Sequence, residues 1–137
     1  MTTITAGVGA QPFLKTLNVL GGREAGEAIG VIAAVYLNAD GTVYNADSDP
    51  TDPLTSVVIG ISVTKAETGS QVVYSYTTGD IIDFGGSLTV GDNYWLDGTT
   101  ITNAYADISS GDYVVKLGYC DETGDFVVNI INQGEVK

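Results

Sequence analysis

Two stretches of the chain alternate strictly between apolar and small or polar residues. The apolar positions are Val57, Ile59, Ile61 and Val63 in the first stretch, and Tyr113, Val115, Leu117 and Tyr119 in the second. Successive side chains of a strand point to opposite faces of a sheet, so a period of two places each apolar set on one face. Each stretch therefore predicts a β-strand with one buried side.

An Asp-Gly pair precedes each alternating stretch and predicts a hairpin. The pairs are Asp40-Gly41 and Asp97-Gly98. Glycine accepts the positive φ that tight hairpin turns require, and aspartate tolerates it. The predicted hairpins join Val31–Leu37 to Thr42–Ala46 and Asn93–Leu96 to Thr99–Asn103.

The same elements recur in the same order along the chain, which indicates an internal duplication. Tyr36 aligns with Tyr94, and the two Asp-Gly turns and the two alternating stretches follow at nearly constant spacing. A fourth strand closes each copy: Val72, Tyr74 and Tyr76 in the first match Phe126, Val128 and Ile130 in the second. The two repeats span about residues 26–84 and 85–134.

Eight short strands with turn-rich links predict an all-β fold, an antiparallel β-barrel or sandwich built from two duplicated four-strand units. At 137 residues there is room for one domain, which we place at residues 23–137. The segment Ile81–Phe84 links the units and is expected to form another hairpin or a protruding loop.

Residues 1–22 lie outside the repeat and predict an N-terminal arm. Phe13, Leu14 and Leu17 are apolar but follow no clean period, as in a segment that becomes ordered against a partner. The alternative is a strand that completes the barrel, because N-terminal strands often join sheets.

Composition narrows the chemistry of this chain. It carries 17 acidic and 5 basic side chains, a formal net charge of −12, with no histidine and the single cysteine Cys120. Such a charge repels nucleic-acid backbones and anionic lipid headgroups, so we expect neither nucleic acid nor a membrane as partner. It favours solubility or a complementary basic partner. Without histidine, Cys120 lacks the usual base, so we expect no enzyme and no cofactor.

Several motifs together resemble small structural proteins of tailed bacteriophages, namely capsid decoration (cement) proteins and related head-fibre bases. The motifs are Gly26-Glu27-Ala28, Val35-Tyr36-Leu37, Val43-Tyr44-Asn45-Ala46, Val58-Ile59-Gly60-Ile61 and Leu88–Leu96. The resemblance covers about residues 26–131 and implies a β-barrel that binds the outside of a capsid, often as a trimer, and stiffens the shell. The implied partner is the major capsid protein. The implied location is the virion surface after synthesis in the host cytoplasm.

A decoration protein needs contact surfaces rather than catalytic groups, and aromatic side chains are the usual anchors of such surfaces. The candidates are Tyr36, Tyr44, Tyr94 and Tyr105 on the domain, with Phe13, Leu14 and Leu17 on the arm. The alternative for each tyrosine is ordinary packing on a sheet face, since aromatic residues are enriched in strands.

An acidic loop offers a second kind of site. Asp47, Asp49 and Asp52 place three carboxylates close together in the chain, and calcium takes six to eight oxygen ligands. The loop lacks the glycine and the closing glutamate of an EF-hand. A plain acidic turn, in which each side chain binds its own backbone, explains the same residues.

A second function fits an all-β module without catalytic groups. A receptor- or glycan-binding module of a phage tail fibre or adhesin would present a shallow site with Trp95 and tyrosines exposed. We prefer the capsid-binding function, because the domain is short and carries no long fibre-forming repeat.

Overall fold

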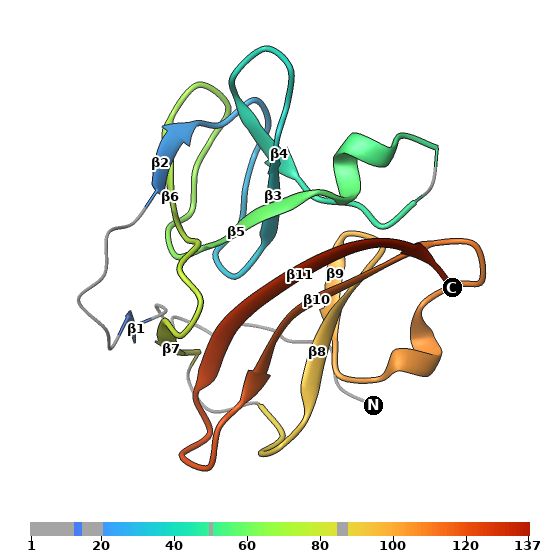
Figure 1. Cartoon of the computed structure of the whole chain (residues 1–137). Coiled ribbons are helices and arrows are strands. Elements are labelled where there is room, and N and C mark those ends of the chain that lie inside the picture. Colours follow the sequence, from blue (N-terminus) through green and yellow to red (C-terminus); the bar gives the residue numbers. More distant parts are fainter. Residues whose placement is uncertain (1–12, 15–20, 50, 85–87) are drawn as a thin grey trace.

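The protein consists of two antiparallel β-sheets, one of six strands and one of five, and the five-stranded sheet lies above the six-stranded one in Figure 1. The computed structural model describes residues 13–14, 21–49, 51–84 and 88–137. The strands are β1 (Phe13–Leu14), β2 (Gly21–Glu24), β3 (Ala34–Leu37), β4 (Val43–Asn45), β5 (Val58–Ser62), β6 (Gln71–Ser75), β7 (Ile81–Asp83), β8 (Asn93–Asp97), β9 (Thr100–Thr102), β10 (Tyr113–Cys120) and β11 (Phe126–Val136). Two 3₁₀ helices, η1 (Pro53–Ser56) and η2 (Tyr105–Asp107), interrupt them. The predicted all-β class is confirmed.

The order of strands in the two sheets carries the duplication. The five-stranded sheet has the order β2-β6-β5-β3-β4, and the six-stranded sheet has β1-β7-β11-β10-β8-β9. The eight predicted strands therefore occupy the same relative places in both sheets. In addition, β2 borders β6 as β7 borders β11, so the duplicated unit has five strands rather than four. The linking segment is a strand of the sheet and not a separate hairpin or loop.

Strand pairing gives a register that differs from the sequence alignment. Tyr36 pairs with Val58 on β5, and Trp95 pairs with Lys116 on β10. Trp95, not Tyr94, is therefore the counterpart of Tyr36. The alignment is wrong by one residue because the first hairpin turn is one residue longer than the second. A slip of one residue moves a side chain to the opposite face of its sheet.

The fourth strands also pair differently from the prediction. Ser62 lies opposite Tyr74, and Cys120 lies opposite Phe126. Tyr74 is therefore the counterpart of Phe126, whereas the sequence alignment matched Val72 to it. This difference of two residues keeps the same face of the strand, so Val72 and Tyr74 are buried as predicted. Tyr76, predicted inward with them, lies after β6 and is exposed.

The main core lies between the sheets. Its largest side chains come from the six-stranded sheet, where the ring of Phe126 packs 5.3 Å from that of Phe84 and 6.1 Å from that of Tyr94, measured between centroids. Ala34 and Ile61 face them from the five-stranded sheet. The opposite face of the five-stranded sheet has a second, smaller cluster: Ala25, Ile29, Val35, Val43, Ala66, Val72 and Tyr74.

Bulges break the alternation that the sequence predicts for β5 and β10. Pairing along β10 shifts between Lys116 and Gly118, and beyond the shift Cys120 is buried while Tyr119 is 38% exposed. On the first unit, Val58 is buried and Val57 is 44% exposed. The predicted inward positions of Tyr119 and Val57 are therefore wrong, because an extra residue in one strand reverses the face of those beyond it. Ile59, predicted on the same face as Ile61, packs on the second cluster instead.

Two polar side chains join the sheets. The amide of Asn132 on β11 accepts a hydrogen bond from the backbone N–H of Val58 (3.1 Å) and donates to its carbonyl oxygen (3.0 Å). The hydroxyl of buried Ser48, after β4, accepts from the N–H of Gly98 (2.8 Å) and donates to Asp112 (3.2 Å). The two units are thus cross-linked by hydrogen bonds as well as by the core.

Two described stretches of the predicted arm are edge strands. Phe13 and Leu14 pair with Asp83 and Ile82 on β7, as the alternative of a strand completing the sheet expects. Gly21 begins β2, which pairs with β6. Leu17 lies outside the described residues, so its role as a partner contact stays a prediction.

Candidate functional site

Tyr36 and Tyr44 form a stacked pair on the five-stranded sheet. They lie opposite each other on β3 and β4, with ring centroids 5.9 Å apart and planes inclined by 27°. Neighbouring strands bring cross-strand side chains close, which is why two tyrosines separated by a hairpin meet here. They border a hollow with a volume of about 530 Å³, whose lining is completed by Glu27, Asn45, Asp47, Thr55 and Thr99.

Carboxylates surround this tyrosine pair. The carboxylate of Glu27 accepts hydrogen bonds from the backbone and side-chain nitrogens of Asn45, both at 2.9 Å. Burial raises the pKa of Tyr36, and the charges of Asp52 and Glu27 raise it further. The Tyr36 hydroxyl therefore stays a protonated donor at neutral pH. The hollow combines aromatic area with negative charge, a combination that suits a basic group on a partner.

The acidic loop beside this hollow is built from backbone turns. Asp47 accepts from the N–H of Asp49 (3.0 Å), and Asp49 accepts from the N–H of Thr51 (2.8 Å). Asp52 caps η1 by accepting from the N–H of Leu54 (3.1 Å). Within the described residues, no three acidic or cysteine side chains gather as metal ligands, so the structure does not bring the three candidate calcium ligands together. These hydrogen bonds fit the alternative prediction of an acidic turn.

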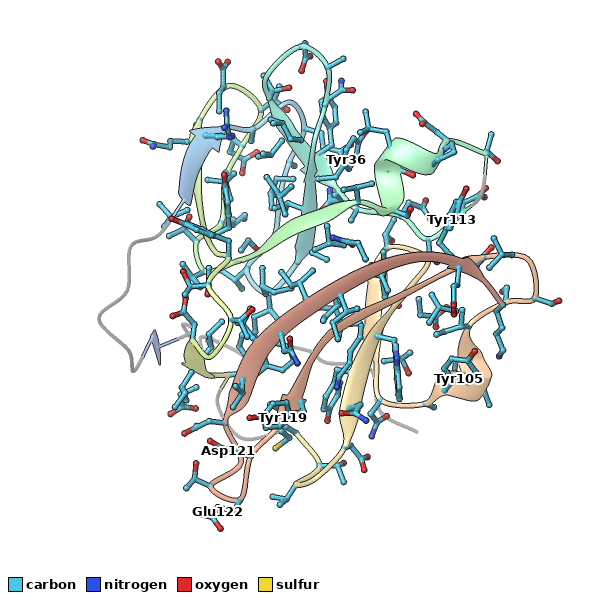
Figure 2. The ribbon with its side chains drawn as sticks, in the orientation of Figure 1. Tyr36, Tyr105, Tyr113, Tyr119, Asp121 and Glu122 are labelled. Carbon is cyan, nitrogen blue, oxygen red and sulfur yellow. The ribbon has the colours of Figure 1, made fainter. Side chains whose placement is uncertain are left out.

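Tyr105 lies apart from that hollow, at η2 beside the C-terminus (Figure 2). Tyr105 is 45% exposed as a residue, and its ring meets Trp95 edge to face, with centroids 5.6 Å apart. The ammonium of Lys137 lies 4.9 Å from the ring centroid and donates to the carbonyl oxygens of Tyr105 (3.0 Å) and Ile108 (2.7 Å). The chain end thus holds Tyr105 in place while leaving one side of its ring accessible.

Tyr94 is not a surface residue. Its side chain is fully buried between the sheets, and its hydroxyl accepts a hydrogen bond from the N–H of Thr89 at 2.9 Å. The prediction that it is an exposed anchor is wrong, and the one-residue slip described above explains why. Trp95, its neighbour in the chain, takes the outward place.

The structure offers no nucleophile at Cys120. The thiol is 1% exposed, and burial raises its pKa, as do the nearby charges of Asp121 and Asp125. The thiolate that nucleophilic chemistry requires is therefore disfavoured.

Sequence reasoning missed two features of this surface. Glu27 belongs to the Tyr36–Tyr44 hollow although it precedes β3, and only the chain path across the sheet places it there. A second hollow, around Arg23 and Tyr74, lies on the outer face of the same sheet. No local sequence pattern distinguishes an aromatic residue beside such a hollow from one in the core.

Comparison with known proteins adds no assignment. The sequence matches no protein-family model, and no curated protein shows significant similarity to it. In the part of the chain that the structure describes, no helix has the length and apolar character needed to span a membrane.

Proposed function

We propose that this protein is a structural component of a phage virion that binds the outer capsid surface and stabilises the shell. The observation that carries the proposal is the stacked pair of Tyr36 and Tyr44 beside the carboxylates of Glu27 and Asp47. Rigid aromatic anchors bury large area at low entropic cost, and the cross-linked sheets hold this pair in a fixed geometry. The motifs that resemble decoration proteins include both tyrosines.

In this proposal the partner is the major capsid protein, and the protein acts as a homotrimer on the shell. A net charge of −12 suits a basic patch on the partner. Of the predicted arm contacts, Phe13 and Leu14 would then meet the capsid from the edge of the six-stranded sheet, and Leu17 remains a candidate contact.

The test is co-sedimentation of the full chain with bare capsids of the candidate phage. Truncating an aromatic hot-spot residue costs about 2 kcal/mol or more, so Tyr36→Ala with Tyr44→Ala should weaken binding by roughly 30-fold or more. Tyr119→Ala, which removes an exposed tyrosine from the other sheet, is the matched control. Wild-type protein that stays in the supernatant would overturn the proposal. Unchanged binding of the double variant would show that Tyr36 and Tyr44 are not the contact with the capsid.

The solution mass, measured by light scattering with and without calcium, tests the assembly. A trimer at micromolar concentration supports the virion function. A calcium-dependent mass would revive the acidic loop as a ligand site. A monomer under both conditions leaves trimers only as a product of assembly on the capsid.

A receptor- or glycan-binding module is the second candidate, and the exposed edge of the Trp95–Tyr105 pair favours it. Aromatic rings stack on the apolar faces of sugars, and Trp95 is the single tryptophan of the chain. Its fluorescence should then change with a sugar from a broad glycan panel. An emission spectrum that no glycan alters would argue against this function.

A further inference from the structure

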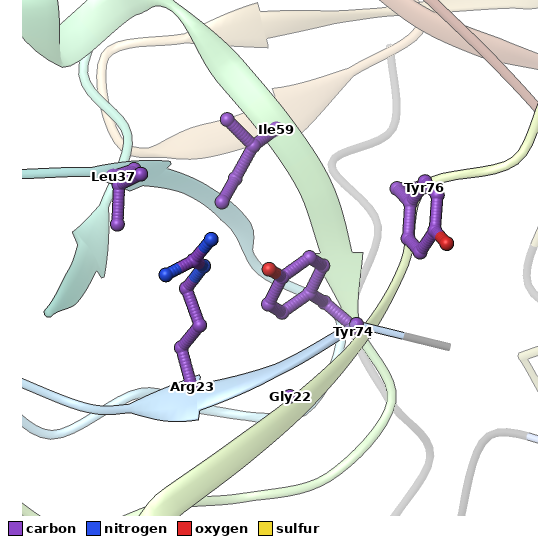
Figure 3. A pocket seen from close by; sticks show the side chains of 7 residues that line it. Gly22, Arg23, Leu37, Ile59, Tyr74 and Tyr76 are labelled. Carbon is purple, nitrogen blue, oxygen red and sulfur yellow. The ribbon is translucent and has the colours of Figure 1, made fainter. Parts of the chain in front are cut away.

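A hollow with a volume of about 560 Å³ opens on the outer face of the five-stranded sheet, away from the main core. Leu37 and Ile59 form its apolar floor, and Tyr76 stands at its rim with 46% of its surface exposed. The rest of the lining of the hollow comes from Arg23 and Tyr74, together with Gly21 and Gly22 of β2 (Figure 3). Its volume lies within the range of small-molecule sites, about 300–1,000 Å³.

The second unit fills the equivalent space with side chains. Gly21 lies opposite Tyr74 in the first unit, and Ile82 lies opposite Phe126 in the second. Two residues further along the chain come Arg23 and Phe84, respectively. The apolar pair Phe84–Phe126 thus corresponds to the polar pair Arg23–Tyr74. In the second unit apolar side chains fill this space. In the first unit the space is an open hollow lined by hydrogen-bond donors.

Glycine at position 21 is required for the open form, because a Cβ there would collide with the ring of Tyr74. Gly22 pairs with Val73, so a Cβ there would lie on the opposite face of β2 and meet only the flexible end of Gln71. A larger residue at position 21 would push the tyrosine ring into the hollow. The absence of side chains here keeps the hollow accessible.

Two polar groups point into the hollow without a protein partner. Tyr74 is 6% exposed, yet its hydroxyl makes no hydrogen bond with any part of the chain that the structure describes. The guanidinium of Arg23 likewise forms neither hydrogen bond nor ion pair there. In Figure 3 both groups are directed toward the same space beneath Leu37 and Ile59. Among the described residues no buried side-chain polar atom lacks a partner, so the Tyr74 hydroxyl is open to the hollow, where solvent or a ligand satisfies it.

We propose that this hollow binds a small organic acid, with its carboxylate on Arg23 and Tyr74 and its apolar body on Leu37, Ile59 and Tyr76. A guanidinium and a phenol both donate hydrogen bonds, and planar guanidinium matches a carboxylate in a two-point geometry. Arg23 is one of five basic residues in a chain of net charge −12, and it stands on an exposed part of β2 where a charged ligand can reach it. This site is independent of capsid binding.

The test is a titration of the ¹⁵N-labelled full chain with phenylacetate, compared with neutral phenylacetamide. Amide shifts should concentrate at Gly21, Gly22, Leu37 and Ile59. A charge-assisted hydrogen bond is stronger than a neutral one, so the acid should bind about tenfold more tightly than the amide.

Variants separate the site from general electrostatics. Arg23→Gln should abolish the preference for the acid, and Tyr74→Phe, which keeps the ring, should weaken binding of the acid. Lys116→Gln removes the same charge from the other sheet and should retain the preference. Equal affinity for acid and amide, an unchanged preference in Arg23→Gln, or equal loss in Lys116→Gln would each overturn the proposal. So would an absence of shifts with phenylacetate up to the millimolar range.

Discussion

The two units share a strand order but differ in what lies on equivalent faces. In the second unit Phe84, Tyr94 and Phe126 fill the space against the other sheet. In the first unit the equivalent face turns outward, and Arg23 and Tyr74 border an open hollow. The sheets therefore pack front to back rather than face to face.

This arrangement separates two tasks within a duplicated fold. Only one unit can place its aromatic face in the main core, because the other sheet covers it with its opposite face. The face left outside can exchange apolar side chains for polar ones without opening the core. A duplicated unit thus supplies both a copy that stabilises the core and a copy whose surface is available for binding.

Phe126 and Tyr74 occupy equivalent positions, and truncating them should change the stability of the protein more than any other substitution discussed below. Phe126→Ala should lower the free energy of unfolding by about 4 kcal/mol, because a closed cavity remains among buried side chains. Tyr74→Ala should cost about half as much, since the removed volume joins an open hollow. Urea denaturation followed by Trp95 fluorescence measures both. Equal losses would mean that the two faces are packed alike.

The equivalent glycines Gly60 and Gly118 test the same difference between the open and the packed face, by adding a methyl group instead of removing a side chain. A Cβ at Gly118 would collide with the carbonyl oxygen of Val127 as well as the ring of Phe126. Gly118→Ala should therefore cost about 3 kcal/mol, because backbone must move. A Cβ at Gly60 would lie closest to the ring of Tyr74, which can tilt into the hollow. The same Cβ would lie 2.9 Å from the carbonyl oxygen of Ser75. Gly60→Ala should cost about 1–2 kcal/mol in the same denaturation experiment. A larger loss at Gly60 than at Gly118 would contradict the contrast.

Asn132 tests how strongly the units are coupled. Asn132→Ala leaves the N–H and carbonyl of buried Val58 without their side-chain partner, so we expect a loss of about 1–2 kcal/mol. Asn129→Ala on the same strand is the matched control and should change stability little. A variant whose two sheets unfold in separate transitions would show that this bridge maintains cooperativity. An unaltered denaturation curve would show that the Asn132 side chain does not contribute to the coupling between the two units.

The smallest effect distinguishes the two Asp-Gly turns. Burial raises the pKa of Asp97, with Asp107 and Asp112 adding to the shift, whereas hydrogen bonds from Thr42 lower the pKa of Asp40. A raised folded-state pKa means that stability falls as pH rises from the unfolded-state value through the folded one. A lowered pKa stabilises above the unfolded-state value, and that contribution is lost as pH falls through the folded one.

Asp97→Asn should therefore raise the melting temperature near neutral pH, and Asp40→Asn should lower it slightly. Melting curves between about pH 3 and pH 7 measure both variants. Shifts of the same sign in the two variants would show that the turns share one electrostatic environment.

The sequence predicts the tyrosine pair of the candidate site but not the second hollow or the burial of Tyr94, and each of these differences has its own physical reason. Tyr36 and Tyr44 flank a hairpin turn, so their proximity follows from local pairing. The hollow of Arg23 and Tyr74 depends on β2 pairing with β6, and three other strands lie between these two in the chain, so no local pattern encodes the pairing. Tyr94 was misplaced because a turn differs in length by one residue between the units.

The all-β class, the eight strands of the repeat and their common order along the chain follow from the amino-acid sequence alone. Alternation and turn chemistry are local properties, so they act before any tertiary contact forms. Which face of each sheet is covered depends instead on how the two sheets pack. Bulges reverse the facing of Tyr119 and Val57, and the front-to-back packing of the sheets buries Phe126 while leaving Tyr74 beside an open hollow. Burial depends on what the opposite sheet covers, and that contact joins residues far apart in the chain.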